Sequence, residues 1–269
     1  MWWRDCLYRM KILLLPCRLV RKCRPALIIL VMVLFSTQGF GQNPTDWKLE
    51  RMPADLETDF ALSSLPPYVR DHATVYLLDP EKGYYVSRQG TNGFICFLVR
   101  TEWESGEFRQ DLASAISYDV VGAKTIFPTY VDVEAMRASG KLTAAQIKDT
   151  MTNRYARGYY KTPERTGISY MLAPVMRTYI GEGSSRHVAS FSMPHYMFYA
   201  PYLTDADIGG NSNSGGPLVL GDGKGPHGYI IVPAGVMEKA KMMEENSALL
   251  KRLIAYKAYF DPGPMKMNH

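Results

Sequence analysis

Cysteine is scarce in this sequence, and its distribution divides the chain in two. Three of the four cysteines lie in the first 41 residues, and only Cys96 follows them. A single cysteine cannot form an internal disulfide, so residues 42–269 must be stabilised by their packing instead. This segment of about 228 residues is long enough for that, since chains of this size bury more than about two-thirds of their unfolded surface.

The front of the chain lacks an apolar run long enough to span a bilayer. The run "PALIILVMVLF" holds about ten residues, whereas a spanning helix needs roughly 20. A basic block over residues 18–24 precedes it, and small residues at 39 and 41 follow it. This order is typical of a secretory signal peptide. We expect residues 1–41 to be a cleaved signal and residues 42–269 to be one exported domain, periplasmic or extracellular, without a membrane span. An uncleaved anchor is the alternative.

An excess of positive charge is absent once the signal is removed. Seven of the 31 basic residues and one of the 26 acidic residues lie in residues 1–41, so the net charge of +5 becomes −1. Without a basic surface there is no electrostatic case for nucleic-acid binding.

Several motifs of known chemistry are also missing. The sequence has no phosphate loop, no dinucleotide fingerprint, no Cys-x-x-Cys pair and no His-Glu-x-x-His. It therefore identifies no cofactor.

Hydrophobic patterning indicates an α+β fold with a mostly antiparallel sheet, a central helical insert and a C-terminal helix. The stretch "DPEKG" predicts a hairpin turn between two strands, and Thr143 and Gln146 have the spacing of a helix-capping box. The apolar run over 93–100 predicts a central strand. The helices are expected over 54–65, 107–116, 133–139, 143–158 and 236–260, and the strands over 73–79, 84–88, 93–100, 168–176, 187–199 and 228–233.

One predicted strand brings a histidine and two methionines to the same face. Alternation along "FSMPHYMFY" places Met193, His195 and Met197 together. Thioether and imidazole groups suit Cu(I), but Met also fills gaps in cores, so a metal site and a core histidine both stay open. Pro194 predicts an edge strand or an irregularity here, because proline cannot donate to a strand ladder.

A second histidine, His227, lies between glycines in "GKGPHGYIIV". If His195 and His227 converge, they could form an acid/base pair or hold a ligand, because imidazole titrates near neutral pH. Candidates to orient them are Glu102, Asp119 and Arg177. The candidate ligand-binding residues are Glu102, Arg177 and Tyr199.

The stretch "NSNSGGPLVL" resembles the nucleophile loop of trypsin-like serine peptidases over about six residues. That resemblance implies a hydrolase with Ser214 as nucleophile, His72 as base and Asp119 as its partner, in the chain order of that family. Ser212 stands where the family usually has an oxyanion-hole glycine, and the helical insert does not fit a double β-barrel. A glycine-rich surface loop is the alternative.

The segments "SYMLAPVMRTY", "SMPHYMFYAP" and "GPHGYIIV" resemble those of an uncharacterised family of exported bacterial proteins. The resemblance implies an unassigned whole-domain family and carries no activity. Three hypotheses remain: a protein that binds a small ligand or metal near His195 and His227, a secreted serine hydrolase, and a non-catalytic envelope or partner-binding protein.

Overall fold

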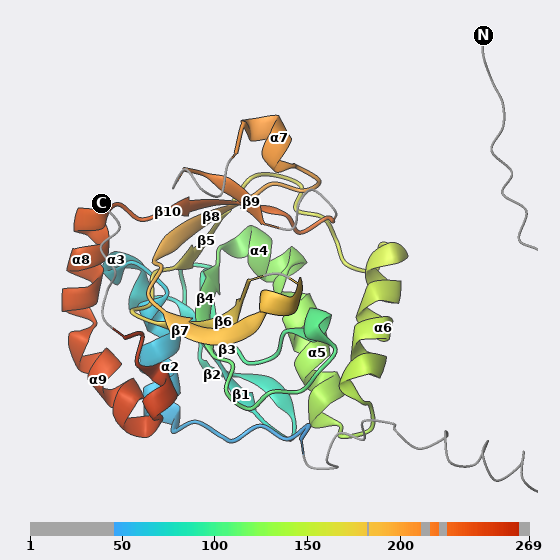
Figure 1. The fold of residues 1–269 in the computed structure, drawn as a ribbon, viewed down its shortest axis with the longest axis horizontal. Helices are drawn as coiled ribbons and strands as arrows, with labels where there is room; N and C mark the ends of the chain where they lie inside the picture. Colours follow the sequence, from blue (N-terminus) through green and yellow to red (C-terminus); the bar gives the residue numbers. More distant parts are fainter. Residues whose placement is uncertain (1–45, 182, 211–215, 221–224, 264–269) are drawn as a thin grey trace, which may run out of the picture. The chain divides into compact units, whose positions relative to one another are not determined.

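An eight-stranded sheet forms the centre of the fold (Figure 1). The computed structural model describes residues 46–181, 183–210, 216–220 and 225–263. The strands are β1 (Thr74–Asp79), β2 (Gly83–Arg88), β3 (Ile95–Val99), β4 (Ser114–Tyr118), β5 (Ile168–Met171), β6 (Met176–Ile180), β7 (His187–Phe191), β8 (His195–Tyr199), β9 (Leu218–Leu220) and β10 (Tyr229–Pro233). The order in the main sheet is β2-β1-β3-β4-β5-β8-β10-β9, and only the β1–β3 pair is parallel. Strands β6 and β7 form a separate two-stranded ribbon.

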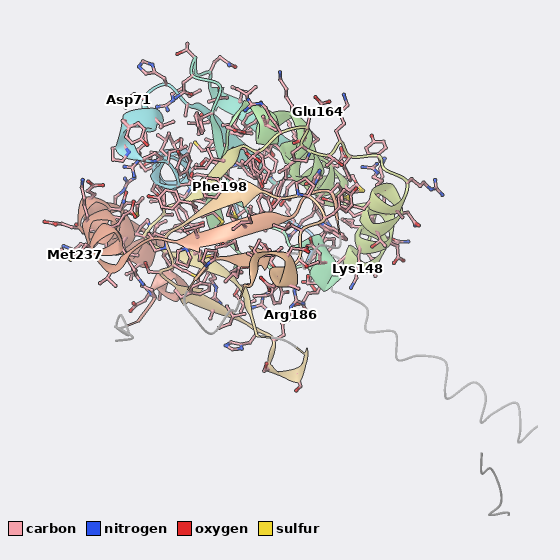
Figure 2. All side chains as sticks on the ribbon, turned by 90° about the horizontal axis from the view of Figure 1, so that it is seen from above. Asp71, Lys148, Glu164, Arg186, Phe198 and Met237 are labelled. Atoms are coloured by element: carbon pink, nitrogen blue, oxygen red, sulfur yellow. The ribbon has the colours of Figure 1, made fainter. Side chains whose placement is uncertain are left out.

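Helices cover the sheet on both faces. The helices are α2 (Ala54–Ser63), α3 (Pro67–Arg70), α4 (Val120–Thr125), α5 (Phe127–Ala138), α6 (Ala144–Ala156), α7 (Asp205–Ile208), α8 (Val236–Glu245) and α9 (Ser247–Tyr256). Helix α2 packs on β1, β3 and β4 beside α9, whereas α5 covers the opposite face with α6 outside it (Figure 1). Figure 2 shows Phe198 in the middle of the sheet, with Met237 of α8 and Lys148 of α6 on opposite sides.

This architecture confirms the α+β prediction. The insert α4–α6 lies between β4 and β5, and the C-terminal segment forms two helices, α8 and α9. The β1–β2 hairpin and the Thr143–Gln146 capping box are also present. No helix in the described ranges is both long enough and apolar enough to cross a membrane.

Strand β3 explains why the sheet needs helices on both sides. Cys96 and Leu98 belong to the core under α2, whereas Ile95 and Phe97 belong to the core under α4 and α5. Successive side chains of a strand point to opposite faces, so an apolar run in β3 produces two apolar surfaces. Each surface requires its own cover.

The helix predicted over 107–116 is wrong, because this segment is a loop that leads into β4. Its alanines suggested helix, but Ala113 and Ala115 have another role: they lie against Leu56 and Phe60 of α2 in the first core cluster. Small side chains in the strand allow a helix to approach the sheet closely. This tertiary requirement outweighs their helix propensity.

The β6–β7 ribbon is the far end of a long hairpin that begins as β5 and β8. Met171 pairs with His195 at the end of the β5–β8 ladder, and pairing resumes at Met176 and Phe191. Both connections between these ladders contain a proline, at 174 and 194. Proline has no N–H to donate, so the ladder breaks in both arms at the same level. The sequence predicted either an edge strand or an irregularity at Pro194. The structure has the irregularity, which is this break, whereas β8 is an interior strand of the sheet.

A buried arginine connects segments that are far apart in the sequence. The Arg137 side chain of α5 donates from Nε to the Trp47 carbonyl (2.6 Å) and from Nη2 to the Arg109 carbonyl (2.8 Å). Its Nη1 donates to the Thr101 hydroxyl (2.7 Å). Burial lowers the pKa of Arg137 to about 10, so it stays charged at neutral pH and holds the entry arm, the end of β3 and the approach to β4 against α5.

We expect Arg137→Met to reduce the free energy of unfolding by about 3 kcal/mol, because it leaves buried acceptors without their donor. Urea unfolding followed by circular dichroism measures this. Arg252→Met is the control, since Arg252 forms exposed ion pairs with Asp55 and Asp59. Equal losses in the two variants would contradict the role assigned to Arg137.

Glu57 is a buried carboxyl on α2 that accepts a hydrogen bond from the Leu78 amide (2.9 Å). Burial raises its pKa to about 7, so the folded state binds a proton that the unfolded state has released. The contribution of Glu57 to the free energy of unfolding is therefore greatest below about pH 4.5, and it is lost as the pH rises to about 7.

We expect Glu57→Gln to remove this loss and to raise the free energy of unfolding at pH 8 by up to about 3 kcal/mol. The measurement is urea unfolding at pH 5 and pH 8. Glu81→Gln, which removes an exposed ion pair with Lys48, should show no such gain. An unchanged pH slope in Glu57→Gln would contradict the prediction.

Candidate functional site

A cavity of about 790 Å³ lies between the sheet, helix α5 and the β6–β7 ribbon. The sheet contributes its β3, β4, β8 and β10 side chains, the ribbon covers them, and α5 and the loop after β3 complete the wall. The lining is mostly apolar. Its polar and ionisable members are Thr101, Glu102, Glu104, Ser114, Thr129, Tyr130, Glu134, Tyr155, Thr178, Tyr179, His195, His227 and Tyr229.

His195 is held with one ring nitrogen available. The side chain is 2% exposed, and Nδ1–H donates to the Met193 carbonyl at 2.7 Å. Burial lowers the pKa of His195, so the ring is neutral at neutral pH. With the proton on Nδ1, Nε2 is a hydrogen-bond acceptor, and it has no protein partner among the described residues.

His227 lines the same cavity, but both of its ring nitrogens are occupied. Nε2–H donates to the Lys161 carbonyl (2.9 Å), which leaves Nδ1 to accept the Tyr155 hydroxyl (3.0 Å). Burial lowers its pKa as well. The two histidines thus share one cavity as the sequence suggested, but only His195 keeps a nitrogen for a ligand. No hydrogen bond or ring contact joins them in the described part of the chain.

Glu134 and Ser114 line the cavity, and each has a buried polar atom without a partner among the described residues. Glu134 is 3% exposed, and neither its Oε1 atom nor the Ser114 hydroxyl has a hydrogen-bond partner in the described ranges. Neither residue stood out in the sequence. A glutamate within an otherwise helical pattern reads as a solvated position, and only the packing of α5 on the sheet turns it inward.

Three tyrosine hydroxyls form a chain in the same wall. Tyr118 lies between Tyr229 (2.9 Å) and Tyr130 (3.3 Å), and the last two line the cavity. Burial raises the pKa of all three phenols, that of Tyr130 to about 12. They are therefore neutral donors and acceptors. The abundance of tyrosine was visible in the sequence, but these partners come from three separate elements.

The other predicted ligand residues divide into two groups. Met193, Met197 and Glu102 line the cavity, and Glu102 accepts a hydrogen bond from the Thr178 hydroxyl of the ribbon. The described residues hold no cluster of three or more His, Cys, Asp or Glu that could bind a metal.

Arg177 and Tyr199 are not among the lining residues. Arg177 points to the other side of the ribbon, where it pairs with Asp111 (2.5 Å) and stacks over Tyr259. Tyr199 donates to the Asp119 carboxylate or to the Ile168 carbonyl, each at 2.9 Å. Both side chains act in positioning the strands around the cavity.

The residues of the hydrolase hypothesis are only partly described. Ser214 lies outside the described residues. Asp119 caps α4 by accepting the Val121 and Gly122 amides, and it also accepts the Ile168 amide. His72 is exposed in a turn, where its carbonyl accepts hydrogen bonds from the loop before β3. Asp119 therefore has a structural role here, and no hydrogen bond between His72 and Asp119 is found in the ranges described.

We expect the folded His195 ring to protonate at a lower pH than the unfolded one and to carry its proton on Nδ1 when neutral, because burial lowers its pKa and the Met193 carbonyl accepts from Nδ1–H. Nitrogen-15 chemical shifts of the imidazole measure this. In urea the same ring should titrate near about 6.5. A folded ring that protonates over the same range as the unfolded one would contradict the assignment.

A scan against protein-family models and searches of curated proteins and of solved structures found no match to this chain. The resemblance to an uncharacterised exported family and the local likeness to trypsin-like peptidases therefore both stay predictions.

Proposed function

We propose that this chain is an exported protein that binds a small, largely apolar ligand in the cavity beneath the β6–β7 ribbon, with His195 Nε2 as an acceptor for the ligand. The export part of the proposal is supported by the order of basic, apolar and small residues in 1–41. The binding part is supported chiefly by one observation, the cavity of about 790 Å³.

The size and lining of the cavity are those of a small-molecule site. Such sites measure roughly 300–1,000 Å³ and combine apolar walls with a few polar groups that orient the ligand. Here Ile116, Met197 and Ile231 supply apolar wall, and His195 supplies an acceptor.

The ribbon is anchored as a roof over this site. The Ala113 and Arg177 main chains exchange two hydrogen bonds (3.1 and 2.9 Å), which join the ribbon to the segment before β4. Hydroxyls of Thr178 and Tyr179 donate to Glu102 and Glu107 on the facing loop. These contacts fix the position of the ribbon next to the cavity.

We expect the purified full-length protein to bind the apolar dye N-phenyl-1-naphthylamine, and Met176→Trp to weaken this binding about tenfold or more, since indole occupies ligand space. Met176 lies on the ribbon and lines the cavity. The measurement is a fluorescence titration of the dye.

Met237→Trp is the matched control, because Met237 is 83% exposed on α8. Its dye affinity should equal that of the wild type. A dye that fails to bind, or that binds Met176→Trp as tightly as Met237→Trp, would show that this cavity is not the site.

A further inference from the structure

The ionisable side chains that line the cavity have one sign of charge. They include three glutamates, Glu102, Glu104 and Glu134, but no lysine or arginine. The two histidines do not offset this, because burial lowers the pKa of both. The basic side chains that interact with these carboxylates, such as Arg186 at 3.9 Å from Glu102, do not line the cavity. An anionic ligand would therefore meet carboxylates first, which is unfavourable in an apolar site.

Of the three glutamates that line the cavity, Glu134 is the most buried. The Thr101 hydroxyl bonds to it, but its Oε1 atom lies buried without a partner in the described ranges. Burial raises the pKa of this group, and attraction to Arg137 and Arg100 opposes the rise.

Neither arginine satisfies the open oxygen. The Arg137 donors go to main-chain carbonyls and the Thr101 hydroxyl, and Arg100 donates to the Leu112 and Gln110 carbonyls. Unpaired buried carboxyl oxygens are rare and costly, and each calls for an explanation. A ligand with a matching donor supplies one.

The surrounding side chains favour a donor that carries positive charge. Aromatic rings of Trp103, Tyr130, Tyr155, Tyr179 and Tyr229 line the cavity. The face of an aromatic ring attracts cations. A charge-assisted hydrogen bond to a carboxylate is also about twice as strong as a neutral one.

We propose that the ligand is an elongated apolar molecule ending in a protonated amine, and that Glu134 receives this amine. This inference rests on the proposed function, because it assigns the chemistry of the ligand in the same cavity. It makes Glu134 the residue that selects cationic over neutral and anionic amphiphiles.

The test compares three probes of equal chain length on the purified full-length protein: decylamine, 1-decanol and decanoate, each displacing N-phenyl-1-naphthylamine at pH 7.5. We expect decylamine to bind about tenfold more tightly than decanol, and decanoate to bind most weakly. The ranking is measured on the wild type and needs no variant.

Glu134→Gln keeps the size of the side chain and removes its charge. It should reduce decylamine affinity about tenfold and change decanol affinity less than about twofold. Glu81→Gln is the matched control: Glu81 is exposed and is not among the residues that line the cavity, so decylamine affinity should not change. Circular dichroism confirms that both variants are folded.

The possible failures are distinguishable. If the dye and decanol bind but decylamine binds no better, or if Glu134→Gln keeps the preference for the amine, the proposed function stands and the assignment of an amine is overturned. If neither the dye nor any of the three probes binds, both proposals are wrong.

Discussion

The break in the β5–β8 hairpin is the constraint on which the rest of the site depends. Had the ladder continued past Met171 and His195, the strands would have extended beyond the sheet, and the apolar face of β3, β4, β8 and β10 would lack its roof. Proline at 174 and 194 stops main-chain pairing in both arms at one level. The distal ribbon then lies across the sheet and is held by the Ala113–Arg177 bridge and by hydroxyl–carboxyl contacts.

A second feature of the site is the set of buried charged side chains beside the sheet. The charged side chains that line the cavity are all acidic. Arg137 donates its hydrogen bonds to main-chain carbonyls and one hydroxyl, so it organises the surrounding loops and acts on Glu134 only through its charge. Burying a charge in this way is unfavourable unless every group is hydrogen-bonded. Arg137 meets that condition, whereas Glu134 has an unpaired oxygen. The same helix therefore carries one buried charge with its hydrogen bonds satisfied and one with an oxygen unpaired in the described part of the chain.

The sequence predicted the fold better than the site, and particular residues show why. The capping box at Thr143, the turn after β1 and the apolar run in β3 are local signals, and all three predictions are confirmed. The helix predicted over 107–116 was wrong because Ala113, just before β4, and Ala115, within it, belong to the core cluster under α2, which no local pattern records. For the site, strand alternation put Met193, His195 and Met197 on one face; all three line the cavity, but Met193 lies in the break before β8 and not in a strand. Glu134 was missed because its burial depends on how α5 packs against the sheet.

The two histidines show how similar residues can acquire different roles from their hydrogen bonds. His227 uses both nitrogens to join Tyr155 to the Lys161 carbonyl, so its ring is part of the wall. His195 commits only Nδ1, to a carbonyl two residues away, which fixes the tautomer and leaves Nε2 as an acceptor. An apolar site gains specificity from a few such unpaired groups, because a ligand that fails to match them leaves them buried without partners. In the proposed function, His195, Ser114 and Glu134 therefore determine which ligand the cavity accepts, whereas the methionines and aromatic rings determine its size.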